Sequence, residues 1–200
     1  MRVTVLRHGK TESNLQHRYL GRTDEELCPL GREELLRKKE AGIYPAQPDC
    51  AVCSPMRRCI QTLQLLYPKL PFAVEQGLRE TDFGAFEGKT YEQLKDDAAY
   101  QQWLATNCEG PVPQGESRAQ MSQRCCAAFA RQVERAFLEG KEQLLIVAHG
   151  GSVMAILERY AAPAQEFYQF HVENGDGYCL EVDSLPLGRC PVRKVCEEEL

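Results

Sequence analysis

Two histidines each follow a short apolar segment and come directly before a glycine. His8 follows the segment 3–6 and Arg7, and His149 follows the segment 144–148. Both segments have the composition of buried strands in a parallel sheet. Ligands of open α/β sheets bind beyond the carboxyl ends of the strands, so the two imidazoles meet in one crevice if these strands are neighbours. Two imidazoles and an arginine suit a phosphate, because one histidine can attack phosphorus while the other groups hold its oxygens.

A second source of positive charge is the start of a predicted helix over 56–66. Ser54 and Pro55 are the residue types expected at an N-cap and in a first helical turn. Arg57 and Arg58 follow them, although cations are disfavoured at the positive end of a helix dipole. A bound anion would reverse that penalty. One of the two arginines is therefore a predicted phosphate ligand, and the local pattern does not say which.

Three carboxylates lie among aromatic residues and glycines in the segment 78–88. They are Glu80, Asp82 and Glu87. A carboxylate beside aromatic rings can act as a general acid. The local pattern does not distinguish the three.

The polar segment 10–24 follows the first strand, at the place where a loop would cover the crevice. We expect Asn14, Arg18 and Gly21 to be candidates for contact with the substrate. His17 is expected to be an ordinary loop residue, because nothing beside it suggests a partner.

Apolar periodicity and turn residues predict alternating strands and helices along the rest of the chain. Helices are expected over 29–41, 56–66, 91–104, 118–140 and 152–160, and strands over 50–53, 72–74, 178–182 and 189–195. The alternation predicts an α/β fold with a mostly parallel sheet. The segment 77–115 interrupts it and would form a helical cap over the crevice. The 200 residues are expected to form a single domain over 1–200.

Composition excludes some partners. The formal net charge is −5, from 24 basic and 29 acidic residues, whereas binding to a nucleic-acid backbone needs a basic field. No apolar run approaches the length of a membrane span, and no signal peptide is recognisable, so we expect no membrane partner and a cytoplasmic location. A small anionic substrate would therefore be bound by a local arginine cluster.

The chain has ten cysteines. They are irregularly spaced and several lie in apolar patterns, so we expect reduced thiols that pack in the core. Cys50 and Cys53 have the spacing of metal ligands, but residues three apart in a strand point to opposite faces and no similar pair follows, so no zinc site is predicted. His171, between Phe170 and Val172, is expected to be a structural residue.

Short motifs follow one another in a fixed order along the chain. They are Leu6-Arg7-His8-Gly9-x-Thr11-x-x-Asn14, Arg18-x-x-Gly21-x-x-Asp24, Pro29-Leu30-Gly31, Ser54-Pro55-x-x-Arg58-Cys59, Leu78-x-Glu80-x-x-x-Gly84-x-x-Glu87-Gly88, Gly115-Glu116-Ser117 and Ala148-His149-Gly150-Gly151. Over nearly its whole length the chain thereby resembles the histidine phosphatase, or phosphoglycerate mutase-like, superfamily. The resemblance implies a three-layer α/β/α sandwich with a small cap insertion.

The resemblance also implies roles for single residues. His8 matches the nucleophile that becomes phosphorylated, and Glu80 matches the proton donor. Arg58, rather than Arg57, matches the second arginine of the site. The residues that would bind the phosphoryl group or line its pocket are Arg7, Asn14, Arg18, Gly21, Arg58, His149 and Gly150. No metal or other cofactor is implied, because the arginines and His149 would meet the charge of the transferring group.

Within the superfamily, the short chain and the segment 78–88 look most like broad-specificity phosphatases and the α-ribazole-phosphate phosphatases of bacterial cobalamin synthesis. Hydrolysis of a small phosphorylated metabolite is therefore expected, with α-ribazole 5′-phosphate as one candidate. A cofactor-dependent phosphoglycerate mutase is the enzymatic alternative, although Lys89-Thr90 after Gly88 departs from the mutase pattern. A non-catalytic phosphoester-binding protein is the other alternative, and a homodimer stays open. Lys10 stands where the family usually has Glu, and could tune the choice of substrate.

Overall fold

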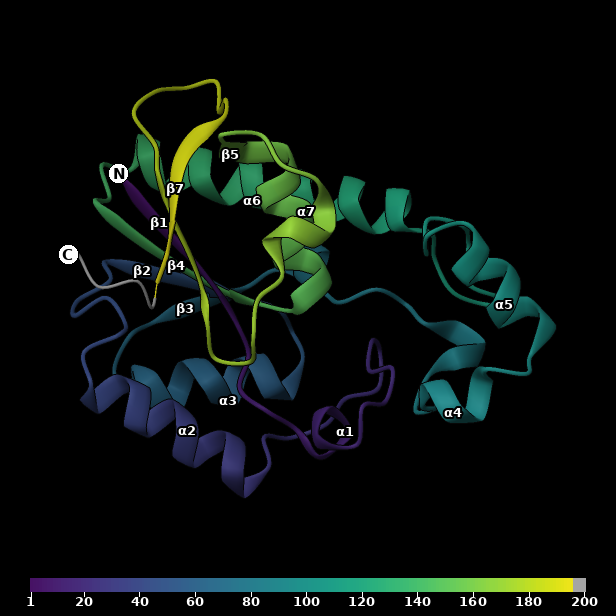
Figure 1. Cartoon of the computed structure of the whole chain (residues 1–200). Helices are drawn as coiled ribbons and strands as arrows, with labels where there is room; N and C mark the ends of the chain where they lie inside the picture. Colours follow the sequence, from purple (N-terminus) through teal and green to yellow (C-terminus); the bar gives the residue numbers. More distant parts are fainter. Residues whose placement is uncertain (196–200) are drawn as a thin grey trace.

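A central sheet organises the computed structural model, which describes residues 1–195 (Figure 1). The acidic end of the chain, for which the sequence predicts no function, lies outside these residues. The strands are β1 (Arg2–Arg7), β2 (Cys50–Cys53), β3 (Phe72–Val74), β4 (Gln143–Ala148), β5 (Ala161–Ala162), β6 (Gly177–Glu181) and β7 (Cys190–Lys194). Their order is β3-β2-β4-β1-β6-β7-β5. Within the described part of the chain only β6 runs against its neighbours, so the predicted mostly parallel sheet is confirmed.

Helices cover both faces of the sheet (Figure 1). The helices are α1 (Glu12–Leu15), α2 (Pro29–Glu40), α3 (Arg57–Leu66), α4 (Tyr91–Leu94), α5 (Ala98–Ala105), α6 (Arg118–Leu138) and α7 (Gly150–Tyr160), with short 3-10 helices η1 (Gln76–Leu78), η2 (Gly84–Phe86) and η3 (Phe167–Phe170). α2 and α3 pack on one face, and α6 and α7 on the other. The three-layer α/β/α sandwich is confirmed.

The central strand β4 is buried on both sides because its side chains alternate between the two layers. Leu144 and Ile146 pack with the α6 and α7 side, whereas Leu145 and Val147 pack with the α2 and α3 side. All four side chains are at most 2% exposed. A polar substitution at any of them would place an unpaired polar group in the core.

The pairing of β1 with β4 brings the two predicted catalytic segments together. The strands are parallel, and Arg7 lies opposite Ala148 in their register. The amide of His8 then donates to the carbonyl of Ala148 at 3.0 Å. His8 and His149 therefore leave the sheet side by side at the carboxyl ends of neighbouring strands.

The predicted start of α3 is wrong. The helix begins at Arg57, and its N-cap Met56 has no side-chain hydrogen bond. The carboxylate of Asp24 accepts instead from the amide of Arg57 at 2.7 Å, so a residue far along the chain caps this helix. Ser54, the predicted cap, contacts His149.

The single helix predicted over 91–104 is two helices, α4 and α5. Asp97 separates them, and its carboxylate accepts from the amides of Ala99 and Tyr100, which makes it the N-cap of α5. An aspartate that caps a new helix in this way competes with continuation of the previous one.

α4 and α5 lie to one side of the sandwich (Figure 1). Their segment, 77–115, has its own apolar cluster, made of Phe86, Leu94, Tyr100, Trp103 and Val112. The hydroxyl groups of Tyr19 and Tyr100 lie 2.7 Å apart and join this cluster to the loop after β1. None of the helices in residues 1–195 combines the length and apolar character needed to cross a membrane.

Candidate active site

His8 is buried at the end of β1 and is held as a neutral imidazole. Its Nδ1 lies 2.6 Å from the carbonyl oxygen of Gly9. Because a carbonyl only accepts, Nδ1 carries the proton and the lone pair is on Nε2. Burial, and then the charges of Arg58 and Arg7, lower the pKa of His8 well below 6.5. The ring is therefore in the form that a nucleophile needs.

His149 and Arg58 lie next to His8 and are fully buried. The ring centroids of His8 and His149 are 5.2 Å apart. Arg58 Nε donates to Nδ1 of His149 at 3.3 Å, so His149 donates through Nε2 to the hydroxyl of Ser54 at 2.7 Å. The pKa of His149 is well below its usual range, because of burial and then the charge of Arg58.

Arg58 also supports the loop after β1. Its guanidinium donates to the carbonyls of Gly21 and Thr23 at 2.7 and 2.8 Å. Neither Arg58 nor His149 is among the residues that line the cavity in front of His8. Their direct contact with a phosphoryl group stays a prediction, whereas Arg57 is exposed and pairs with Glu26.

Arg7 has a buried donor without a partner. Its Nη1 donates to the carbonyl of Val172 at 2.8 Å. Its Nε is the one buried side-chain nitrogen or oxygen in residues 1–195 that has no hydrogen-bond partner. Gly150, the first residue of α7, keeps the space beside it open, since a Cβ there would lie 3.5 Å from Nε. An unpaired buried donor at a helix N-terminus is suited to an anion.

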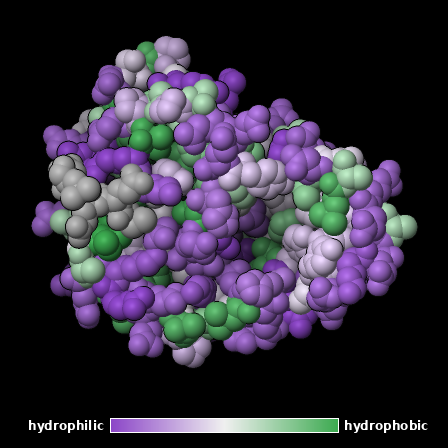
Figure 2. Space-filling view, viewed as in Figure 1, coloured by the Kyte–Doolittle hydropathy of each residue, from purple (hydrophilic) through white to green (hydrophobic). Residues whose placement is uncertain are grey.

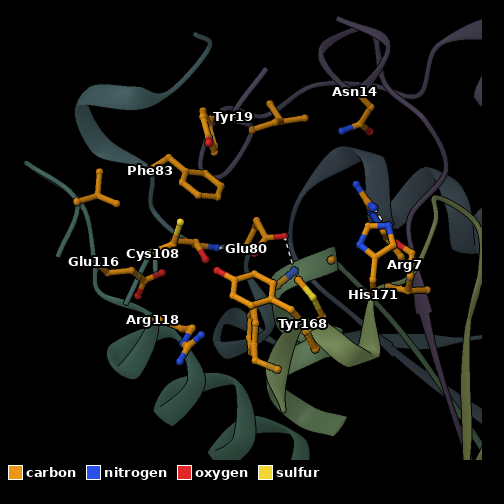
Figure 3. Close-up of a pocket in the computed structure, with 18 of the residues that line it drawn as sticks. Arg7, Asn14, Tyr19, Glu80, Phe83, Cys108, Glu116, Arg118, Tyr168 and His171 are labelled. Carbon is orange, nitrogen blue, oxygen red and sulfur yellow. Dashed lines mark hydrogen bonds between the residues drawn. The ribbon is translucent and has the colours of Figure 1, made fainter. Parts of the chain in front are cut away.

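Glu80 lies opposite, after η1, and is 8% exposed. Its Oε1 accepts from the amide of Thr81 at 2.8 Å and its Oε2 from the amide of Gly151 at 2.9 Å (Figure 3). Arg124 on α6 holds the same loop, because it donates to the carbonyls of Arg79 and Glu80 at 2.6 and 2.7 Å. Arg124 also pairs with Glu116.

The three candidate acids differ in position and in partners. Glu80 lines the cavity, and Asp82 and Glu87 do not. Asp82 pairs with Arg22 at 3.0 Å. Glu87 accepts from the amides of Gly21 and Arg22 at 3.0 and 2.8 Å, and so holds the 21–23 loop.

The loop residues predicted to touch substrate have different positions. Asn14 and Arg18 line the cavity, whereas Gly21 does not. Close packing requires a glycine at position 21, because a Cβ there would lie 1.8 Å from the carbonyl oxygen of Thr81. Lys10 pairs with Glu34 at 2.8 Å and borders an adjoining cleft with Asn14 and Arg18.

The cavity in front of His8 has a volume of about 380 Å³. It opens as a hollow between the sandwich and the segment with α4 and α5 (Figure 2). The sequence predicted that segments 10–24 and 77–115 cover the crevice, but it did not single out most of the residues that line it. The unpredicted lining includes Tyr19, Phe83, Trp103, Cys108, Val112, Glu116, Arg118, Met154, Phe167, Tyr168 and His171. These residues come from segments far apart in sequence, and no local motif connects them.

The prediction for His171 is wrong. Phe170 and Val172 are buried, but the side chain of His171 is 65% exposed and lies 3.1 Å from Glu173. It borders the cavity beside Arg7 (Figure 3).

The nine cysteines within 1–195 are free thiols, as predicted. In the same residues no group of three or more His, Cys, Asp or Glu side chains could hold a metal ion.

Comparison with known families agrees with this geometry. The model of the histidine phosphatase superfamily (branch 1) matches residues 3–185. The chain belongs to this superfamily. The match spans both strand ends with the buried histidines and the loop that carries Glu80.

The relatives of this chain have names that describe different activities. A 2,3-bisphosphoglycerate-dependent phosphoglycerate mutase of Cytophaga hutchinsonii is 30% identical over 164 residues, which cover 78% of this chain and 75% of the relative. A glucosyl-3-phosphoglycerate phosphatase of Mycolicibacterium vanbaalenii is 31% identical over 163 residues, 78% of this chain and 72% of the relative. The crystal structure of the α-ribazole phosphatase from Shigella flexneri superposes with a TM-score of 0.78 at 25% identity, covering 92% of this chain and 91% of the other. Relatives of similar identity thus carry out different reactions.

Proposed function

We propose that this histidine phosphatase hydrolyses the phosphomonoester of a small metabolite through a phosphohistidine on His8. The observation that carries the proposal is the unpaired, buried Nε–H of Arg7 beside a neutral His8 whose Nε2 is free. A phosphoryl oxygen would satisfy that donor and would bring phosphorus to the imidazole.

In the first step, Nε2 of His8 attacks phosphorus and the bond from phosphorus to the ester oxygen breaks. Protonated Glu80 gives its proton to the departing oxygen, so the alcohol leaves neutral. The carbonyl of Gly9 continues to hold the proton on Nδ1, which stabilises the positive charge that the phosphorylated ring acquires.

In the second step, water attacks the phosphorus of the phosphohistidine. The Glu80 carboxylate takes a proton from this water, the bond between phosphorus and nitrogen breaks, and its electron pair returns to Nε2. Inorganic phosphate leaves, and His8 and Glu80 are back in their starting forms.

Charge on the transferring group would be met by Arg7 and the N-terminus of α7, with Arg58 and His149 close behind. These groups supply the electrostatic stabilisation that a metal ion gives other phosphatases. Turnover in the presence of EDTA is therefore part of the proposal, as is a small phosphorylated partner. A cytoplasmic location and a possible homodimer stay predictions.

α-Ribazole 5′-phosphate is one candidate substrate, supported by the likeness to the Shigella flexneri α-ribazole phosphatase. Phosphoglycerate mutase activity is the second candidate, because the Cytophaga hutchinsonii relative bears that name. Incubation with 3-phosphoglycerate and 2,3-bisphosphoglycerate separates the two, since a mutase isomerises the monophosphate and a phosphatase releases inorganic phosphate.

The nucleophile is tested by turnover of p-nitrophenyl phosphate in EDTA and by trapping of labelled phosphoenzyme in an alkaline detergent quench, because the bond between phosphorus and nitrogen in phosphohistidine is labile in acid. We expect His8→Ala to lose activity by at least about 10³-fold and to trap no label. His17→Ala, which changes an exposed histidine that does not line this cavity, is the matched control and should stay within about threefold of the wild type. Equal rates for the wild type and His8→Ala would refute the proposal.

A further inference from the structure

The cavity in front of His8 is much larger than a phosphoryl group needs. Its volume is about 380 Å³, which is in the range of pockets that enclose a whole small-molecule ligand. Arg7 lies at one end of it, away from Cys108, Glu116 and Arg118 (Figure 3). The remaining space would be available to the alcohol part of a substrate, so its walls indicate what that alcohol is.

Aromatic rings form two walls of this space. On one side Tyr19, Phe83 and Trp103 pack together, with ring centroids 5.1 to 6.4 Å apart. On the other side Phe167 and Tyr168 lie 5.1 Å apart. Phe83 and Tyr168 point into the cavity from opposite sides (Figure 3). Flat rings on two sides suit a flat, apolar group between them.

The charged groups at the aromatic end are compensated within the chain. Arg118 pairs with Glu109, and its guanidinium lies 5.0 Å over the ring of Phe167. Glu116 pairs with Arg124. Among the described residues that line this end, these two side chains carry the formal charge, so a second anionic group on the substrate would find no uncompensated cation there.

Arg18 lines the cavity and also the adjoining cleft with Asn14. Its guanidinium donates to the side chain of Gln16 and to the carbonyl of Gly88. These hydrogen bonds engage the guanidinium of Arg18 within the chain.

The backbone also holds the Tyr168 wall in place. Asn107 and Cys108 have positive φ values of 54° and 59°, a conformation that residues other than glycine rarely adopt. The carbonyl of Asn107 accepts from the Tyr168 hydroxyl at 3.3 Å, and Cys108 lines the cavity. Such outliers persist only where the surroundings fix them, and they concentrate at ligand sites.

We propose that the cavity selects phosphomonoesters whose alcohol carries an uncharged, flat aromatic group. This inference rests on the proposed function, and it favours such esters over small acidic ones such as phosphoserine and 3-phosphoglycerate. Stacking between the two aromatic walls would hold the alcohol while Arg7 and His8 hold the phosphoryl group.

The test compares 2-(2-naphthyl)ethyl phosphate with propyl phosphate and phosphoserine. All three are esters of primary alcohols, so differences in kcat/KM report chiefly on binding of the alcohol part. We expect the naphthyl ester to exceed both others by about 10²-fold, because burial of a bicyclic ring is strongly favourable. An equal or higher kcat/KM for propyl phosphate or phosphoserine would overturn the inference.

Tyr168 gives a matched set of variants, since 46% of the residue is exposed and its removal leaves the core intact. Tyr168→Ala should lower kcat/KM for the naphthyl ester about tenfold and change propyl phosphate less than twofold. Tyr168→Phe should keep most of the naphthyl preference. Tyr91→Ala, an exposed tyrosine outside the cavity, should change neither ester. An equal loss for both esters in Tyr168→Ala would contradict stacking.

Binding without turnover separates this inference from the proposed function. Calorimetric titration with the two non-hydrolysable phosphonates, naphthylethyl and propyl, needs no catalysis. If the wild type hydrolyses neither ester, the proposed function fails. The titration alone then shows which phosphonate the cavity prefers. About 10²-fold tighter binding of the naphthyl phosphonate supports the inference, and equal binding refutes it.

Discussion

The two ends of the cavity are built from different parts of the fold. At the phosphoryl end, Arg7 and His8 stand at the end of β1 and His149 at the end of β4, in the most buried part of the sheet. At the aromatic end, the rings come from the loop after β1, from segment 77–115 and from η3. The reacting groups are thus fixed by strand pairing, whereas the groups that would select the alcohol are on connections that can change without disturbing the sheet.

Glu80 belongs to neither end alone. It follows η1 in the 77–115 segment, yet its Oε2 is held by the amide of Gly151 at the start of α7. The proposed proton donor is therefore positioned jointly by segment 77–115 and by the sandwich.

The largest expected difference comes from Glu80→Gln. Without a proton donor, a poor alkoxide leaving group suffers more than a good one, so we expect kcat/KM to fall about 10³-fold for propyl phosphate and about tenfold for p-nitrophenyl phosphate. Asp82→Asn, in the same loop but turned to Arg22, is the control and should lower both rates equally and by less than about threefold. An equal loss for both esters in Glu80→Gln would remove Glu80 from the proton-transfer role.

Arg7→Lys should have the next largest effect. Lysine keeps the charge, but it has no counterpart of the buried, unpaired Nε–H. We expect kcat/KM to fall about 10²-fold for every phosphomonoester, because removal of a preorganised donor from a transferring group usually costs that much. Arg2→Lys, at the exposed start of the same strand, controls for the change of residue type. If Arg7→Lys retained full activity, the donor would have no role in phosphoryl binding.

The phosphoryl end was largely predictable from the sequence because short-range pattern and strand pairing agree there. An apolar segment that ends in His-Gly occurs twice, and both segments are central strands whose ends meet. The N-terminus of α6 was predictable for the same reason, since Ser117 and Gln120 form their capping box within one turn.

The remaining features depend on contacts between distant residues. Asp24 caps α3, and no local signal near Arg57 indicates it. Glu80 is distinguished from Glu87 only by whether the partner is Gly151 or Gly21. The aromatic walls join five rings from the loop after β1, segment 77–115 and η3, and neither composition nor periodicity pairs them. The exposure of His171 was hidden by its buried neighbours.

Stability should depend on pH through the buried histidines of the phosphoryl end. Burial first, and then nearby arginines, hold the pKa values of His8 and His149 well below 6.5. Between these lowered values and about pH 6.5 the unfolded chain binds more protons than the native one, so the free energy of unfolding falls as the pH decreases. Above that window the stability is fully present. Two such groups give a slope of up to about 2.7 kcal/mol per pH unit.

Urea unfolding at about pH 7 and about pH 5.5 measures this slope. His149→Gln should reduce it by about half, because one of the two titrating groups is gone. His171→Gln changes an exposed histidine and should leave the slope unaltered. A wild-type slope near zero over this interval would mean that the buried imidazoles are not held neutral.

The smallest expected effect tests how α6 supports the loop that carries Glu80. Arg124 donates to the carbonyls of Gly77, Arg79 and Glu80 and pairs with Glu116, so it fixes the backbone that carries the proposed proton donor. Arg124→Gln should lower kcat/KM about tenfold for propyl phosphate and about twofold for p-nitrophenyl phosphate, in the same direction as Glu80→Gln but more weakly. Arg131→Gln, on the same helix in an exposed pair with Glu75, should change neither. A purely structural role for Arg124 would lower both rates in the same proportion, and that outcome would mean that the 77–82 loop holds Glu80 without help from α6.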